Sequence, residues 1–242
     1  VRDNLTYSGG LFAAIGSGGK VQNLVLENVD ISVTPETLAS AGALAGELAG
    51  EVRNVHVTSG SVMGGYDVGG LVGIASGGAV IAESCAHVKV DGAALRVGGL
   101  VGLLEDSTVY ESCATGDVSG GADVGGLAGY IEASEVSDSY ASGSVSGYDS
   151  VGGLIGGVQP DLDNWQPNST LERVHAVGKV QMLGEGNAGG LIGDNTSPIT
   201  LISAYYSREK TGQSDERQYS GTPLDPDEIE EDIFENWDFD TL

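Results

Sequence analysis

The hexapeptide Val-Gly-Gly-Leu-Val-Gly at residues 97–102 recurs with small changes along the whole chain. Seven copies are recognised by their leucines, which are Leu11, Leu44, Leu71, Leu100, Leu127, Leu154 and Leu191. The copies lie about 30 residues apart, a period that is typical of stacked repeat arrays. Because each repeat of such an array packs mainly on its neighbours, we expect one elongated body rather than several globular domains.

A strand pattern follows each copy of the hexapeptide. Residues 109–114 and 136–141 alternate small or apolar residues with polar ones, and this period of two indicates strands with one buried face. Ser112 and Ala114 share the inward parity, and Cys113 has the outward one. No segment carries a helical stripe, so strands of successive repeats should stack directly, about 4.8 Å apart. The sequence predicts an all-β fold, a parallel β-solenoid (β-helix) of either hand, with about seven coils over residues 1–207.

Glycine and leucine have separate expected tasks in each hexapeptide. Glycine supplies backbone angles with positive φ where a narrow coil turns sharply, and it lets neighbouring walls approach closely. The leucine of each copy should point into the core. The seven leucines are therefore expected to form one continuous hydrophobic spine.

Residues 208–242 leave the repeat pattern and become polar and acidic. Within them, Asp225 as N-cap, Pro226 at the first helical position and Glu228 in a capping box predict the start of a helix. An open solenoid end exposes strand edges and core. We therefore assign residues 208–242 as a small helical or irregular C-terminal cap.

The composition is strongly acidic, with 35 Asp and Glu against 10 Lys and Arg and a formal net charge of -25. Such a surface repels nucleic acid and anionic membranes, so neither is expected as a partner. Concentrated salt, where the screening length falls to about 3 Å at 1 M, would suit this charge; an acidic secreted protein of ordinary habitat is the alternative. The sequence has no apolar run of about 18 residues, so direct membrane insertion is not expected. Val1 lies within the pattern, which suggests a mature or trimmed fragment without its targeting signal.

The repeated hexapeptide resembles the GLUG motif, named for Gly-Leu-any-Gly. The segments Ser-Cys-Ala-Thr-Gly-Asp-Val (112–118) and Ser-Tyr-Ala-Ser-Gly-Ser-Val (139–145) resemble it further. The resemblance implies a secreted or cell-surface β-solenoid that serves as a stalk, adhesin or structural repeat. Its expected partners are other copies or neighbouring domains of a larger surface assembly. The resemblance transfers no catalytic residue.

In-register stacking is expected to align one column of side chains on the outer face: Val25, His56, Cys85, Cys113, Tyr140, His175 and Tyr205. Cys85 and Cys113 would then lie on adjacent coils, with Cα atoms about 5 Å apart and within disulfide range. A disulfide between coils is one interpretation, and a pair of unbonded thiols is the other. Zinc or copper held by His56 and the two cysteines is disfavoured, because a straight column is not a tetrahedron.

A second column occupies the turn four residues before each leucine: Asp67, Arg96, Asp123 and Asn187, with Asp149 displaced by one step. An exposed charge ladder explains this alternation of sign. Calcium at Asp67, Asp123 and Asp149 is the sharper hypothesis, although these turns lack the full nonapeptide of calcium-binding β-rolls. No other cofactor is expected.

The sixth repeat is lengthened by a loop that carries Trp165, with Asp161, Asp163 and Asn164 beside it. An aromatic ring outside the repeat pattern, next to polar groups, could stack on a cell-surface glycan. The alternative is that Trp165 folds back over the solenoid flank. Asn4, Asn168 and Asn195 begin glycosylation sequons, which are compatible with export.

Catalysis finds little support in the sequence. His56, His87 and His175 are spread over separate repeats, and no acid–base constellation is visible. We therefore expect a non-catalytic protein with an extracellular structural or adhesive role. A glycan-binding or glycan-processing β-helix module is one alternative function. A self-assembling filament or virion surface subunit is the other.

Overall fold

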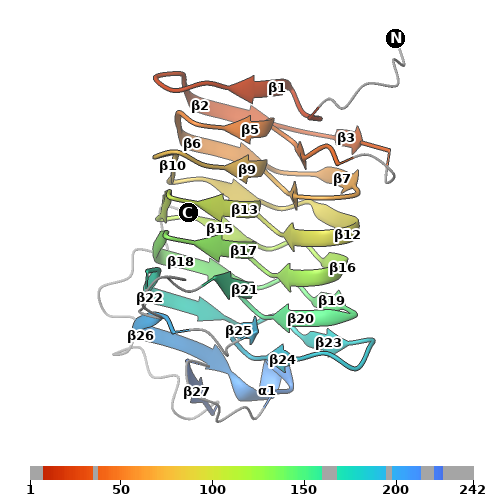
Figure 1. Cartoon of the computed structure of the whole chain (residues 1–242), viewed down its shortest axis with the longest axis vertical. Coiled ribbons are helices and arrows are strands. Elements are labelled where there is room, and N and C mark those ends of the chain that lie inside the picture. Colours follow the sequence, from red (N-terminus) through yellow and green to blue (C-terminus); the bar gives the residue numbers. More distant parts are fainter. Residues whose placement is uncertain (1–7, 35–37, 160–167, 195–197, 214–220, 226–242) are drawn as a thin grey trace.

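The chain winds into a β-solenoid whose strands stack in layers along one long axis (Figure 1). The computed structural model describes residues 8–34, 38–159, 168–194, 198–213 and 221–225. Every strand pairing among these residues is parallel, as direct coil-on-coil stacking requires, and it is seen for example between β5 and β9 and between β13 and β17. The predicted all-β parallel solenoid is therefore confirmed.

The second half of each hexapeptide begins a strand of the first sheet. Its seven strands follow one another in the order of the sequence. They are β1 (Phe12–Ile15), β5 (Ala45–Leu48), β9 (Val72–Ala75), β13 (Val101–Glu105), β17 (Ala128–Glu132), β21 (Ile155–Gln159) and β25 (Ile192–Asp194). The parallel pairing keeps equivalent residues of successive copies opposite each other, as Val101 lies opposite both Val72 and Ala128.

The alternating segments form the second sheet. Its strands are β2 (Lys20–Leu26), β6 (Glu51–Val57), β10 (Val80–Ala82), β11 (Cys85–Ala86), β14 (Thr108–Tyr110), β15 (Cys113–Ala114), β18 (Glu135–Ala141), β22 (Thr170–Ala176), β26 (Thr200–Ser207) and β27 (Thr222–Leu224). The third sheet closes each coil. It contains β3 (Val29–Ser32), β4 (Ala41–Gly42), β7 (Gly60–Gly64), β8 (Val68–Gly69), β12 (Lys89–Gly98), β16 (Val118–Gly125), β19 (Val145–Gly147), β20 (Asp149–Gly152), β23 (Val180–Met182) and β24 (Ala188–Gly189).

The hexapeptide leucines form a buried spine inside the three sheets. The backbone N–H of Leu71 donates to the carbonyl oxygen of Leu100 at 2.9 Å, and that of Leu100 donates to Leu127 at 2.8 Å. Six of the seven leucines, from Leu44 to Leu191, have no exposed side-chain surface. Leu11 is 56% exposed because no described coil covers the first one. The prediction of a seven-leucine spine is therefore wrong at its first position.

The hexapeptide glycines are needed for close approach and not for positive φ. A Cβ at Gly99 would lie 2.1 Å from the carbonyl oxygen of Gly126 on the next coil, and one at Gly98 would lie 2.0 Å from that of Val101. Neither glycine has a positive φ. The expectation that glycines make the sharp turns is wrong for these positions, where residues with side chains make the nearby corners, but Gly60, Gly77 and Gly78 do take positive φ.

Two columns of left-handed residues mark these corners. The first, in the second sheet, is Asn23, Asn54, Glu83, Glu111, Asp138, Arg173 and Ser203, with φ between 48° and 55°. The second, before the hexapeptides, is Asp67, Arg96, Asp123 and Ser150, with φ between 46° and 55°. A left-handed residue costs roughly 1–2 kcal/mol, which stacking must offset at every level.

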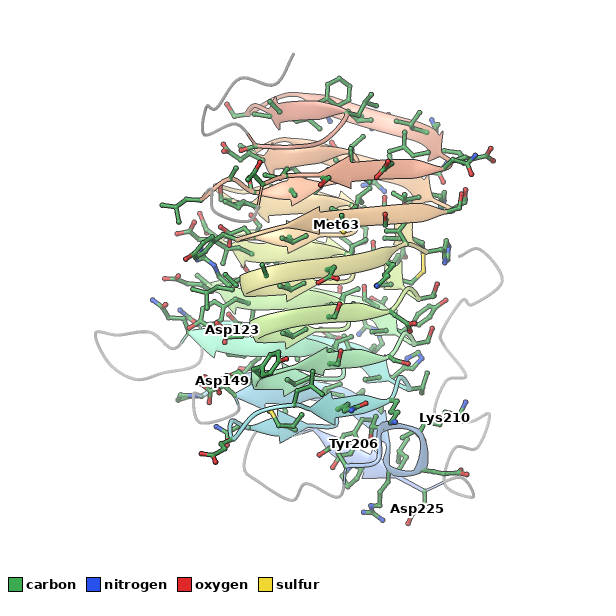
Figure 2. All side chains as sticks on the ribbon, turned by 90° about the vertical axis from the view of Figure 1, so that its right-hand side faces the viewer. Met63, Asp123, Asp149, Tyr206, Lys210 and Asp225 are labelled. Carbon is green, nitrogen blue, oxygen red and sulfur yellow. A yellow bond between two sulfur atoms is a disulfide. The ribbon has the colours of Figure 1, made fainter. Side chains whose placement is uncertain are left out.

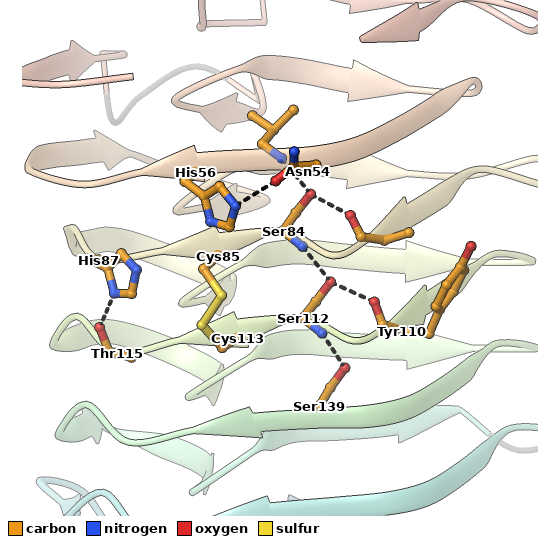
Figure 3. The surroundings of a disulfide bond; sticks show 12 residues. Asn54, His56, Ser84, Cys85, His87, Tyr110, Ser112, Cys113, Thr115 and Ser139 are labelled. Atoms are coloured by element: carbon orange, nitrogen blue, oxygen red, sulfur yellow. Dashed lines mark hydrogen bonds between the residues drawn. A yellow bond between two sulfur atoms is a disulfide. The ribbon is translucent and has the colours of Figure 1, made fainter. Parts of the chain in front are cut away.

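A buried serine follows several corner residues and bonds the backbone that the corner leaves unpaired. Ser84, Ser112 and Ser139 have no exposed surface, and Ser112 therefore faces inward as predicted. The backbone N–H of Ser84 donates to Ser112 Oγ at 3.2 Å, and the N–H of Ser112 donates to Ser139 Oγ at 3.1 Å (Figure 3). These hydroxyls satisfy buried N–H groups that would otherwise destabilise the fold.

The described part of the C-terminal segment continues the second sheet. After β26, the short helix α1 (Arg208–Thr211) begins at Ser207, whose Oγ accepts a bond from the N–H of Lys210, and ends at Gly212 with φ 70°. Strand β27 then pairs with β26. The helix predicted to begin at Asp225 lies outside the described residues, and the division of the chain at residue 207 stays a prediction.

Candidate functional site

One column of side chains runs the length of the second sheet in register. Its members are Val25, His56, Cys85, Cys113, Tyr140, His175 and Tyr205, each paired with the next. The outward parity predicts that the whole column is exposed, and this prediction is wrong for part of it. Cys85 and Cys113 are completely buried, and His175 is 9% exposed. The middle of the column is therefore a protected environment.

Cys85 and Cys113 lie on β11 and β15, and their sulfur atoms are joined 2.03 Å apart in a disulfide, with the Cα atoms 4.6 Å apart (Figure 3). The parallel register places the two residues directly opposite each other. The bond closes a loop with a sequence separation of 28 residues. A loop of this length limits the unfolded chain enough to contribute roughly 3–4 kcal/mol in the chain-entropy model.

Two histidines flank the disulfide. The ring Nδ1 of His87 lies 2.6 Å from Thr115 Oγ1, and the ring Nε2 of His56 lies 2.9 Å from Asn54 Oδ1 (Figure 3). Partial burial lowers the pKa of His87, and the nearby His56 lowers it further. A ring nitrogen of His87 and the two cysteine sulfurs lie within 4.8 Å of one another. The sequence analysis considers His87 only as a catalytic residue and does not place it beside the cysteines, because it follows only the repeated column; the Cys-Ala-His spacing was the available signal.

Lower in the same column, the rings of Tyr140 and His175 stack, with centroids 5.1 Å apart and planes 10° from parallel. Burial lowers the pKa of His175 to about 4. The imidazole is therefore neutral at physiological pH. The stack extends the apolar environment of the disulfide towards the next coils.

The model of the GLUG motif family matches residues 120–146. The chain carries the GLUG motif. A stretch of 79 residues is 37% identical to halomucin from Haloquadratum walsbyi, and it covers 33% of this chain and 1% of that protein. A solved structure from Bacteroides ovatus, described as a candidate immunoglobulin A1 protease, superposes with a TM-score of 0.72 at 19% identity, over 87% of this chain and 70% of that one. At this identity the superposition shows a shared fold alone.

The matched GLUG motif corresponds to one complete coil. It begins within β16, includes β17 and β18, and ends within β19, so that it contributes to all three sheets. Asp123 and Tyr140, from the two predicted columns, both lie inside it. One motif therefore supplies one level of each column.

The turn column has two parts: Asp67 pairs with Arg96, whereas Asp123 and Asp149 are both carboxylates. Asp67 is 4% exposed, and its Oδ1 lies 2.5 Å from Arg96 Nε on the next coil. Burial raises the pKa of Asp67, and Arg96 opposes that shift. Asp123 and Asp149 lie at neighbouring levels on the same side of the solenoid (Figure 2).

The pKa of Asp123 is raised to about 6, first by burial and then by repulsion from Asp149 and Asp194. In the described part of the chain, the three predicted calcium ligands do not form a compact group of ligand atoms. Asp67 is already neutralised by Arg96. The calcium hypothesis at Asp67, Asp123 and Asp149 therefore gains no ligand set and stays a prediction.

Several predicted site residues lie outside the described residues. These are Asp161, Asp163, Asn164 and Trp165 of the sugar-contact hypothesis, and the sequon residues Asn4 and Asn195. Asn168 is described; it is half-buried, and its Oδ1 accepts a bond from the Ser169 hydroxyl at 3.4 Å. Within the described ranges, no helix has the length and apolar character needed to cross a membrane.

Proposed function

We propose that the chain is a structural segment of an extracellular surface protein, a stalk or adhesive spacer without a catalytic site. The carrying observation is the continuous bonding of coil to coil, because every level repeats the same backbone contacts along one axis. Such an array gives length and stiffness without a cleft at a domain boundary. The GLUG motif and the match to halomucin support this proposal.

The histidines support the non-catalytic part of the proposal. The ring partner of His87 is a threonine hydroxyl, and that of His56 is an asparagine amide. A catalytic histidine is usually oriented by a carboxylate and adjoins a nucleophile. His175 is stacked on Tyr140 and neutral. The surroundings of the three described histidines therefore favour a role in packing and hydrogen bonding over one in catalysis.

The first coil supports the proposed partners, which are neighbouring domains or other copies of the chain. Leu11 is 56% exposed, Phe12 41% and Val25 55%. The middle-coil residues equivalent to Leu11 and Phe12, such as Leu100 and Val101, are completely buried. A further coil with the same register would cover these side chains and extend the sheets. The proposed assembly therefore continues the solenoid at its N-terminal end.

We further propose that the protein works in concentrated salt. A formal net charge of -25 on 242 residues destabilises a folded body by self-repulsion. Salt at 1 M shortens the screening length to about 3 Å and removes most of that repulsion. The expected result is a melting temperature that rises steadily from low salt to molar sodium chloride. Equal melting temperatures in both would contradict the salt proposal.

Two measurements test the structural role. Electron microscopy of the purified chain should show short rods, and antibody labelling of intact source cells should place the protein outside the cell. A glycan array then separates a spacer from an adhesin or glycan module. A spacer binds no glycan, whereas an adhesin binds a defined set and loses it in Trp165→Ala. Hydrolysis of a bound glycan would overturn the non-catalytic proposal, and long filaments would favour self-assembly.

A further inference from the structure

The disulfide has a third potential ligand beside it that departs from the straight column. His87 lies two residues after Cys85 and therefore projects on the same side of the chain. Its ring and the sulfurs of Cys85 and Cys113 place three ligand atoms within 4.8 Å of one another. Figure 3 shows His87 to one side of the disulfide, so the three groups form a triangle and not a line. The objection that a column cannot surround a metal does not apply to this set.

The chemistry of the set fits zinc. Zinc binds thiolate sulfur at about 2.3 Å and imidazole nitrogen at about 2.0 Å, and two sulfurs on a tetrahedral ion are about 3.8 Å apart. Cys85 and Cys113 have Cα atoms 4.6 Å apart on adjacent coils. Rotation of the two side chains, without movement of the backbone, can open the sulfurs to that separation once they are no longer bonded.

The imidazole of His87 is oriented by a bond of its own. Its Nδ1 contacts Thr115 Oγ1 at 2.6 Å, which leaves Nε2 for a ligand. Metal-bound histidines usually have such a partner on the other ring nitrogen, because it fixes the ring and the tautomer. Thr115 follows Cys113 by two residues, so the orienting group comes from the same pair of coils as the sulfurs.

We propose that the reduced protein binds one zinc-class divalent ion through Cys85, Cys113 and His87, so that the same two sulfurs act either as a cross-link or as metal ligands. A thiol reductant gives two electrons to the disulfide and is itself oxidised to a disulfide, which leaves two thiols. Zinc binding then releases the two thiol protons. In the oxidised protein the sulfurs bond each other, and the thiolates that zinc requires are absent. A water molecule completes the fourth position.

Cobalt(II) is the probe for this site, because thiolate-bound cobalt has a strong charge-transfer absorption that carboxylate-bound cobalt lacks. The chain is purified under dithiothreitol, freed of it without oxygen and titrated with cobalt. We expect the absorption to saturate at one ion per chain and to be removed by zinc. The air-oxidised protein should show no such band, although its acidic surface will bind cobalt weakly.

His87→Ala is the decisive variant, because His87 is exposed and its loss should leave the fold intact. We expect cobalt affinity to fall more than about ten-fold. The matched control is His175→Phe, which retains a ring against Tyr140 and should leave the affinity unchanged. If the reduced chain unfolds, zinc should restore its β-sheet circular dichroism. Absence of the band in the reduced protein, equal affinity in His87→Ala, or failure of zinc to restore the fold would each overturn the proposal.

Discussion

Truncating the central leucine of the spine tests whether stacked side chains stabilise this solenoid. Leu100 is completely buried and lies between Leu71 and Leu127. Leu100→Ala removes three carbon groups worth about 0.8 kcal/mol each, and the cavity adds to that loss. We expect the free energy of unfolding to fall by about 3–4 kcal/mol. Leu11→Ala is the matched control, and because Leu11 is 56% exposed its cost should be about 1 kcal/mol.

The assay is urea unfolding at fixed salt with the disulfide oxidised, followed by circular dichroism. Repeat arrays do not always unfold in one step. Hydrogen exchange at the amides of Leu71 and Leu100 therefore supplies a local measurement. Both amides donate to the next coil, so their protection should fall in Leu100→Ala. A cost below about 1 kcal/mol for Leu100→Ala, or equal costs for the two variants, would refute the stacking argument.

Three further changes test other features. Gly99→Ala should lower the free energy of unfolding by about 1–3 kcal/mol, because the new Cβ would lie 2.1 Å from the carbonyl oxygen of Gly126. Gly16→Ala is the control: its Cβ would have no atom within 4 Å, so its thermal unfolding should change little. The pKa of Asp123 is about 6 when folded and about 3.9 when unfolded, so the folded state binds more protons between pH 4 and 6 and its stability falls as pH rises through that window. Asp123→Asn should remove that part of the fall, and identical pH profiles of the melting temperature would contradict the assignment. Arg96→Met leaves the buried Asp67 without its cation. Because the Arg96 side chain is 33% exposed, the free energy of unfolding should fall by about 1–3 kcal/mol, and a second change, Asp67→Asn, should recover most of that loss in a double-mutant cycle.

The periodic features of this molecule were predictable because the repeat itself encodes them. Recurrence of the same motif places equivalent residues of successive coils opposite each other, and this predicts both the spine and the column through Cys85 and Cys113. The period of two identifies the inward serines, such as Ser112. Neither conclusion requires knowledge of the hand of the coil, which the sequence left open.

Features that depend on the ends or on backbone strain were not predictable in the same way. A periodic pattern cannot show that Leu11 lacks a covering coil. The corners were assigned to glycine, whereas Glu83, Glu111 and Asp138 take the left-handed conformation. The signal was present, because each of these residues precedes a buried serine. The position of His87 beside the disulfide was not predicted because this histidine belongs to a single repeat.

The columns of left-handed corners have a consequence for how such a protein can change in length. A residue gained or lost between two corners would turn every later side chain of that strand to the opposite face. Duplication or loss of a whole motif leaves the phase of all corners unchanged. Unequal recombination between copies can therefore lengthen or shorten the molecule in steps of one coil, about 4.8 Å each, without any compensating substitution.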